Sequence, residues 1–154
     1  MARRPVAAKR LNAANLAGLG ADRIAELLME ASDSDPILKR RLRLVMAAEA
    51  GPEVLGLELD KRLTTIATSR ARVSWRKRPD LLRDLDILRR GILDDLAPAA
   101  PSAGLERMIG WLDLFRGLAA RVKDQKGEVA AAVVLAVPDP RPPVGDEAER
   151  FAAR

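Results

Sequence analysis

The stretch that decides the fold is residues 35–52, DPILKRRLRLVMAAEAGP. Its first two residues are Asp35 and Pro36. An Asp side chain caps the free N–H groups of a first helical turn, and Pro at the next position loses no helical hydrogen bond. The closing pair is Gly51-Pro52, in which Gly ends one helix and Pro begins the next. Apolar residues recur between these signals at helical spacing, so a helix is predicted here. The face expected to be buried consists of Leu38, Leu42, Val45 and Met46.

The same Gly and Pro signals divide the rest of the chain into helices. Short connections between helices of this length imply antiparallel neighbours. The prediction is an all-α fold of six or seven helices, arranged as an antiparallel bundle or as a short superhelical stack of helical hairpins. The expected helices cover about residues 12–19, 21–31, 35–50, 52–69, 79–96 and 103–115, with a shorter continuation past Gly117 to about 126 and a segment 130–137 that fits either a helix or a strand.

Three regions are expected along the chain: a flexible basic tail over 1–10, a single helical domain over 11–137, and a Pro-rich tail over 138–154. Each amphipathic helix of the domain should turn one apolar stripe toward a common core. The stripes outside the opening stretch are Ile24, Leu27, Leu28 and Ala31, then Leu55, Leu59, Leu63, Ile66 and Ala67, then Leu81, Leu85, Leu88 and Ile92, and then Leu105, Met108, Ile109 and Leu112.

The composition argues against several kinds of chemistry. The chain has no Cys, no His and no Tyr. Disulfides, thiolate chemistry, the usual zinc ligands and the usual proton shuttle at neutral pH are therefore excluded. Asp84 and Asp86 resemble a metal-binding pair, but residues two apart on a helix point about 200° away from each other. Asp86 is instead placed to pair with Arg90, one turn away. We expect no metal, no cofactor and no enzymatic activity.

Location is inferred from what the sequence lacks. No segment approaches the roughly 20 apolar residues of a membrane span. Four basic residues lie within 1–10, and no apolar signal core follows them, so export is not expected. The chain is predicted to be cytoplasmic, with no membrane partner.

Several segments carry a family resemblance. They are Leu11-Asn12-Ala13-Ala14-Asn15-Leu16, Asp35-Pro36 running into Lys39-Arg40-Arg41-Leu42-Arg43, Asp60-Lys61-Arg62-Leu63, and Leu85-Asp86 with Leu88-Arg89-Arg90. Together they resemble a bacterial family of helical domains of unknown function, number 6880, over about residues 10–128. The resemblance implies a helical fold and supplies no catalytic residue.

Positive charge is concentrated in one block. Residues 61–90 hold ten basic and three acidic side chains, an excess of seven, in a chain whose net charge is +5. Clustered Arg residues offer bidentate contacts to phosphates, and an exposed Trp can stack on a base. The candidate site for an anionic partner is the connection between helices 52–69 and 79–96, and its residues are Arg70, Arg72, Trp75, Arg76, Lys77 and Arg78.

Two interpretations of this connection stay open. In the first, Trp75 packs into the junction between the two helices and the cations are only solvated, as is expected also for Lys39, Arg40, Arg41 and Arg43 on the preceding helix. In the second, Trp75 and the cations form a binding surface. The predicted function is an interaction module that binds another protein, and an acidic partner would suit its clustered cations. The alternative is an accessory nucleic-acid-binding domain that uses residues 61–90.

Overall fold

The all-α prediction is confirmed. The computed structural model describes residues 10–122 and 127–136, so most of the predicted basic tail and all of the Pro-rich tail lie outside the described residues. The described part contains seven helical segments if α5, the π-helical turn η1 and α6, which follow one another without a break, are taken as one. The elements are α1 (Ala13–Ala17), α2 (Ala21–Ser34), α3 (Pro36–Ala50), α4 (Pro52–Thr68), α5 (Arg78–Arg90), η1 (Gly91–Leu96), α6 (Ala97–Ala99), α7 (Pro101–Arg121) and α8 (Glu128–Ala136).

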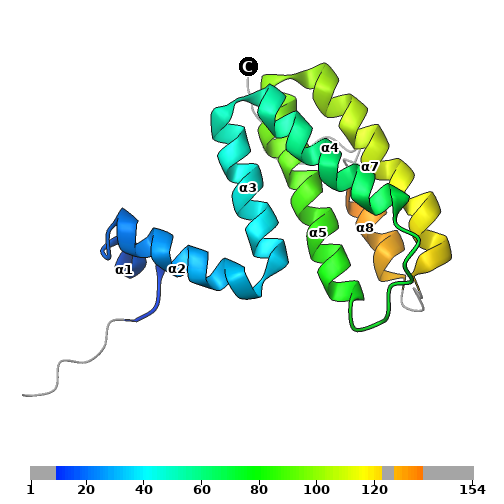
Figure 1. Ribbon diagram of the computed structural model, residues 1–154. Coiled ribbons are helices and arrows are strands. Elements are labelled where there is room, and N and C mark those ends of the chain that lie inside the picture. Colours follow the sequence, from blue (N-terminus) through cyan, green and yellow to red (C-terminus); the bar gives the residue numbers. More distant parts are fainter. Residues whose placement is uncertain (1–9, 123–126, 137–154) are drawn as a thin grey trace, which may run out of the picture.

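Four long segments form an antiparallel bundle. In Figure 1, α3, α4, α5 with its continuation, and α7 run alternately up and down. Helix α8 packs against α5 and α7 at one end of this bundle. Helices α1 and α2 extend to one side, and α2 packs against α3 (Figure 1). Of the two predicted arrangements, the structure has the bundle.

The punctuation around α3 acts as the sequence predicts. Asp35 has extended backbone geometry, and its Oδ1 accepts hydrogen bonds from the backbone N–H groups of Ile37 at 3.0 Å and Leu38 at 3.1 Å. Gly51 has φ +126°, a conformation that L side chains rarely adopt, and Pro52 begins α4 directly after it. Asp35 and Gly51 therefore fix where α3 begins and where it ends.

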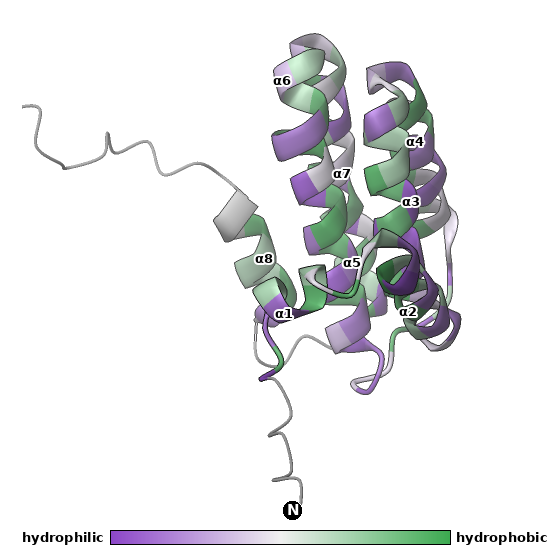
Figure 2. Ribbon diagram, turned by 90° about the vertical axis from the view of Figure 1, so that its left-hand side faces the viewer, coloured by the Kyte–Doolittle hydropathy of each residue, from purple (hydrophilic) through white to green (hydrophobic). Residues whose placement is uncertain are grey.

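The core lies between the four long segments, and each helix shows hydrophilic and hydrophobic residues around its circumference (Figure 2). Helix α4 buries Leu55, Leu59, Leu63 and Ile66, all on the predicted stripe. The predicted Ala67 is exposed. On α5 and η1, Leu85, Leu88 and Ile92 are buried as predicted, and Leu81 is partly buried against the core.

The predicted face of α2 is wrong, because Leu27, Leu28 and Ala31 are exposed. The predicted faces of α3 and α7 are right only in part, since Met108 and Leu112 pack against the core but other predicted residues do not. On α3 the buried residues are Ile37, Leu44 and Ala47, while Val45 is 50% and Met46 72% exposed. Each of these helices carries two apolar stripes at helical spacing, and periodicity alone does not say which stripe meets the core. On α7 the core takes Gly104, Trp111, Leu114 and Leu118, while the predicted Leu105 and Ile109 are exposed.

The predicted interruption at Gly117 is also wrong. Helix α7 continues through this residue to Arg121. Gly117 is exposed, and a weak helix former there costs less than the burial of Leu114 and Leu118 on the same helix contributes. Segment 130–137, for which the sequence allowed a helix or a strand, is helical and belongs to α8 as far as Ala136.

The structure also bears on membrane insertion. None of the helices in residues 10–122 and 127–136 combines the length and the apolar character that crossing a membrane requires.

Candidate functional site

The connection between α4 and α5, residues 69–77, is fixed to the ends of two helices. Val73 forms a parallel bridge with Val122, and its N–H donates to the carbonyl oxygen of Arg121 at 3.1 Å. The Arg121 guanidinium donates to the carbonyl oxygens of Ile66 at 2.8 Å and Ala71 at 3.3 Å. These bonds join the connection to the end of α4 and to the end of α7, so its shape is set before any partner arrives.

Trp75 is exposed on this connection, and the interpretation that packs it into the helix junction is wrong. Its side chain is 68% exposed, and the Arg76 guanidinium lies over its ring at 5.2 Å from the centroid. A turn in which the N–H groups of Lys77 and Arg78 both donate to the Ser74 carbonyl turns Trp75 outward. Val73, not Trp75, packs against the core here.

The six predicted site residues separate into two groups. Arg78 begins α5, is only 14% exposed, and makes an ion pair of 2.8 Å with Glu128, so it joins α5 to α8. The guanidinium of Arg78 therefore serves the packing of α8. The other five are exposed and remain together on the connection: Arg70, Arg72, Trp75, Arg76 and Lys77.

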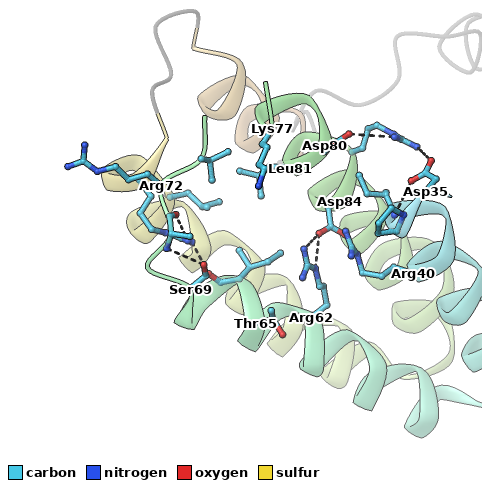
Figure 3. Close-up of a pocket in the computed structure, with 18 of the residues that line it drawn as sticks. Asp35, Arg40, Arg62, Thr65, Ser69, Arg72, Lys77, Asp80, Leu81 and Asp84 are labelled. Carbon is cyan, nitrogen blue, oxygen red and sulfur yellow. Dashed lines mark hydrogen bonds and ion pairs between the residues drawn. The ribbon is translucent and has the colours of Figure 1, made fainter. Parts of the chain in front are cut away.

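A cleft of about 590 Å³ lies behind the connection. Its walls are the start of α3, the second half of α4, the connection, the start of α5 and the end of α7. The two predicted site residues that line it are Arg72 and Lys77. In Figure 3 the Lys77 side chain points into the cleft, whereas the end of the Arg72 side chain points away from it.

A charged cluster forms the floor of this cleft. The Asp84 side chain is 2% exposed and receives donors from two other helices (Figure 3). Arg40 Nε donates to Oδ1 at 2.9 Å, and Arg62 Nε donates to Oδ2 at 2.7 Å with a further bond from Nη2. A carboxylate is this deeply buried only when its charge is compensated, and two guanidinium groups compensate it here.

The sequence interpretation missed this cluster. It treated Asp84 only as half of a rejected metal-binding pair and Arg40 as a solvated cation, and the second point is wrong. One signal was available, because Asp84 lies inside the apolar stripe that includes Leu81, Leu85 and Leu88. A carboxylate in a buried stripe requires a cationic partner.

A second ion-pair group lies at the rim of the cleft. Arg83 on α5 donates to Asp35 Oδ2 at 3.0 Å and lies 3.7 Å from Asp80. The hydrogen bond from Arg83, together with the N–H of Leu38, holds the pKa of the Asp35 carboxyl below its usual value. The helix cap is thus also a link between α3 and α5.

The model of a family of unknown function (DUF6880) matches residues 6–144 of the chain. The chain belongs to this family. The match extends beyond the resemblance at both ends and includes every described residue of this DUF6880 chain, so the connection and the cleft both lie within it. No curated protein and no solved structure matched the chain.

The two carboxylates that resembled a metal-binding pair point apart in this DUF6880 chain. Asp84 faces the cleft, while Asp86 pairs with Arg89 at 2.7 Å and with Arg90 at 2.9 Å, which confirms the predicted Asp86–Arg90 pair. In the part of the chain that the structure describes, no group of three or more acidic residues gathers at a spacing that could hold a metal ion.

Proposed function

We propose that this protein is a cytoplasmic interaction module that binds an acidic surface of another protein through the exposed face of the connection. The observation that carries the proposal is Trp75, which is 68% exposed on a fixed loop with Arg76 stacked on its ring. Arg70 and Arg72 are exposed on the same connection and make no ion pair with another described residue.

Protein interfaces use residues of these types. Trp and Arg are over-represented among the residues that contribute most of the binding energy, because each covers a large area and also offers polar or charged contacts. A fixed loop loses little conformational entropy when a partner binds. The bridge from Val73 to Val122 and the bonds from Arg121 give the connection this preorganisation. The uncompensated cations add electrostatic attraction toward an acidic partner.

The proposal assigns a binding role and not a catalytic one. Of the carboxylates that line the cleft, Asp84 is saturated by two guanidinium groups, and Asp35 and Asp80 face Arg83. A general acid or base needs a group that can exchange a proton with a substrate. Carboxylates held in this way by arginines are poorly suited to that task.

Nucleic-acid binding is the second candidate, and one observation favours it. The Trp75 ring with Arg76 over it is a surface on which a base could stack. Proteins that bind along a single strand of nucleic acid use several such aromatic side chains in succession. Among the described residues Trp111 is buried and Phe115 packs against it, which leaves Trp75 as the one exposed aromatic ring. Because a single exposed ring does not match a surface that binds along a nucleic-acid strand, a protein is the preferred partner.

The experiment compares charge reversal on the connection with the same reversal elsewhere. The tested variant carries Arg70→Glu, Arg72→Glu and Arg76→Glu, and the matched control carries Arg41→Glu, Arg43→Glu and Arg116→Glu, all exposed. Each variant serves as bait in an extract of the native organism at about 150 mM salt, where long-range attraction is screened. We expect the wild type and the control to capture the same protein, with and without nuclease, and the loop variant to lose it.

Two outcomes would contradict the proposal. Equal loss of the partner from both variants would mean that net charge, and not the connection, determines capture. Loss of capture after nuclease treatment would assign the connection to nucleic acid instead.

A further inference from the structure

We propose that the cleft behind the connection binds a small ligand through a phosphate group. The inference stands apart from the proposed partner surface, because the cleft is lined by inward-facing groups whereas Trp75 and Arg76 lie outside it. Its central residues are Arg40, Arg62 and Lys77.

Hydrogen-bond donors remain available on two of the arginines that line the cleft. Arg40 uses only Nε for Asp84, which leaves both of its Nη groups, and Arg62 uses Nε and Nη2, which leaves Nη1. These remaining groups make no hydrogen bond to another described residue, and the two side chains are 29% and 27% exposed. A guanidinium group offers its donors in a planar array that matches the oxygen atoms of a phosphate.

The charge in the cleft suits a doubly charged anion. Asp84 neutralises one of the two arginines, so the cluster keeps one positive charge, and the Lys77 ammonium that points into the cleft adds a second (Figure 3). A phosphate monoester carries about −1.5 to −2 at neutral pH. The other charges in the lining cancel. Arg83 faces both Asp35 and Asp80, which leaves one negative charge, and Arg121, which donates to backbone carbonyls, keeps its positive charge.

The arginines are also held in place before a ligand arrives. Asp84 is buried on α5 and fixes Arg40 from α3 and Arg62 from α4, so three helices determine where the free donors lie. Groups that are fixed in advance lose little side-chain entropy on binding. The ion pairs therefore give the floor a geometry that flexible surface lysines would lack.

The size of the cleft indicates a ligand larger than phosphate itself. Its volume of about 590 Å³ is within the range of small-molecule sites, which are about 300–1,000 Å³. Apolar side chains complete the wall and could cover the uncharged part of a phosphorylated compound. They are Ile66, Val73 and Leu81.

The test uses inorganic pyrophosphate as the probe, titrated into the whole protein by isothermal calorimetry at a constant ionic strength of about 150 mM. We expect saturable binding by the wild type and binding weakened about tenfold by Lys77→Gln, which removes one charge-assisted contact. Lys77 is exposed and makes no ion pair with another described residue, so this variant should fold normally. The matched control is Arg76→Gln, which removes a charge one residue away but outside the cleft.

Three results would overturn the inference. The first is no saturable binding of pyrophosphate by the wild type. The second is equal weakening by Lys77→Gln and Arg76→Gln, which would mean diffuse attraction to the positive surface. The third is binding of succinate as tight as that of pyrophosphate, which would show that the site does not select phosphate. Loss of partner capture has no bearing on these results, so this inference and the proposed function can fail separately.

Discussion

Replacing Trp111 by Ala lowers the free energy of unfolding by about 3–5 kcal/mol, the range for truncating a large aromatic side chain in a core. Trp111 is 1% exposed on α7, packs edge-on against Phe115 with ring centroids 4.9 Å apart, and donates from Nε1 to the Leu85 carbonyl at 2.9 Å. The variant leaves a cavity between α5 and α7 and removes a bond between them. Urea unfolding followed by circular dichroism measures the loss.

The matched control for Trp111 is Leu105→Ala on the same helix. Leu105 is 63% exposed, although the helical spacing of apolar residues predicted that it would be buried. Its truncation should change the free energy of unfolding by about 0.5 kcal/mol or less. Comparable losses from the two variants would mean that α7 is rotated from the orientation described.

Replacing Asp84 by Ala should cost about 3 kcal/mol, near the lower end of the range for breaking a buried ion pair. The variant leaves Arg40 and Arg62 close together with no carboxylate between them. The cost stays near the lower end because both arginines line an open cleft, where water can reach their free donors. The same unfolding measurement applies.

Asp86→Ala is the matched control for Asp84, two residues along the same helix. Asp86 is 40% exposed and pairs with Arg89 and Arg90 at the surface, where an ion pair contributes at most about 1 kcal/mol. If Asp84→Ala cost no more than Asp86→Ala, the cluster would not be a structural part of the cleft floor.

Local signals in the sequence predicted the helices and the corners between them. Asp35 and Gly51 act through backbone geometry and hydrogen bonds within a few residues, and this is information that a sequence carries directly. The rotation of α3 and α7 about their own axes could not be predicted from such local signals. The choice between the Leu105 and Trp111 stripes of α7 depends on which residues the neighbouring helices present.

The candidate site was predictable only where its residues are neighbours in the sequence. The cations of the connection are adjacent in the sequence, so their gathering was visible, and the structure keeps all of them but Arg78 on one exposed segment. The Asp84 cluster joins residues 22 and 44 positions apart. Its existence follows from the packing of α3 and α4 against α5, which no local pattern specifies.

The most direct test of the proposed function is the amount of partner protein that the Trp75→Ala variant captures at about 150 mM salt, relative to the wild type. Because the ring is 68% exposed, this variant should unfold with the wild-type free energy, within about 0.5 kcal/mol. We predict that it nonetheless captures the partner about thirtyfold more weakly, the loss typical of an interface residue that contributes roughly 2 kcal/mol. Capture equal to that of the wild type, by a variant of unchanged stability, would contradict the assignment of the connection as the binding surface.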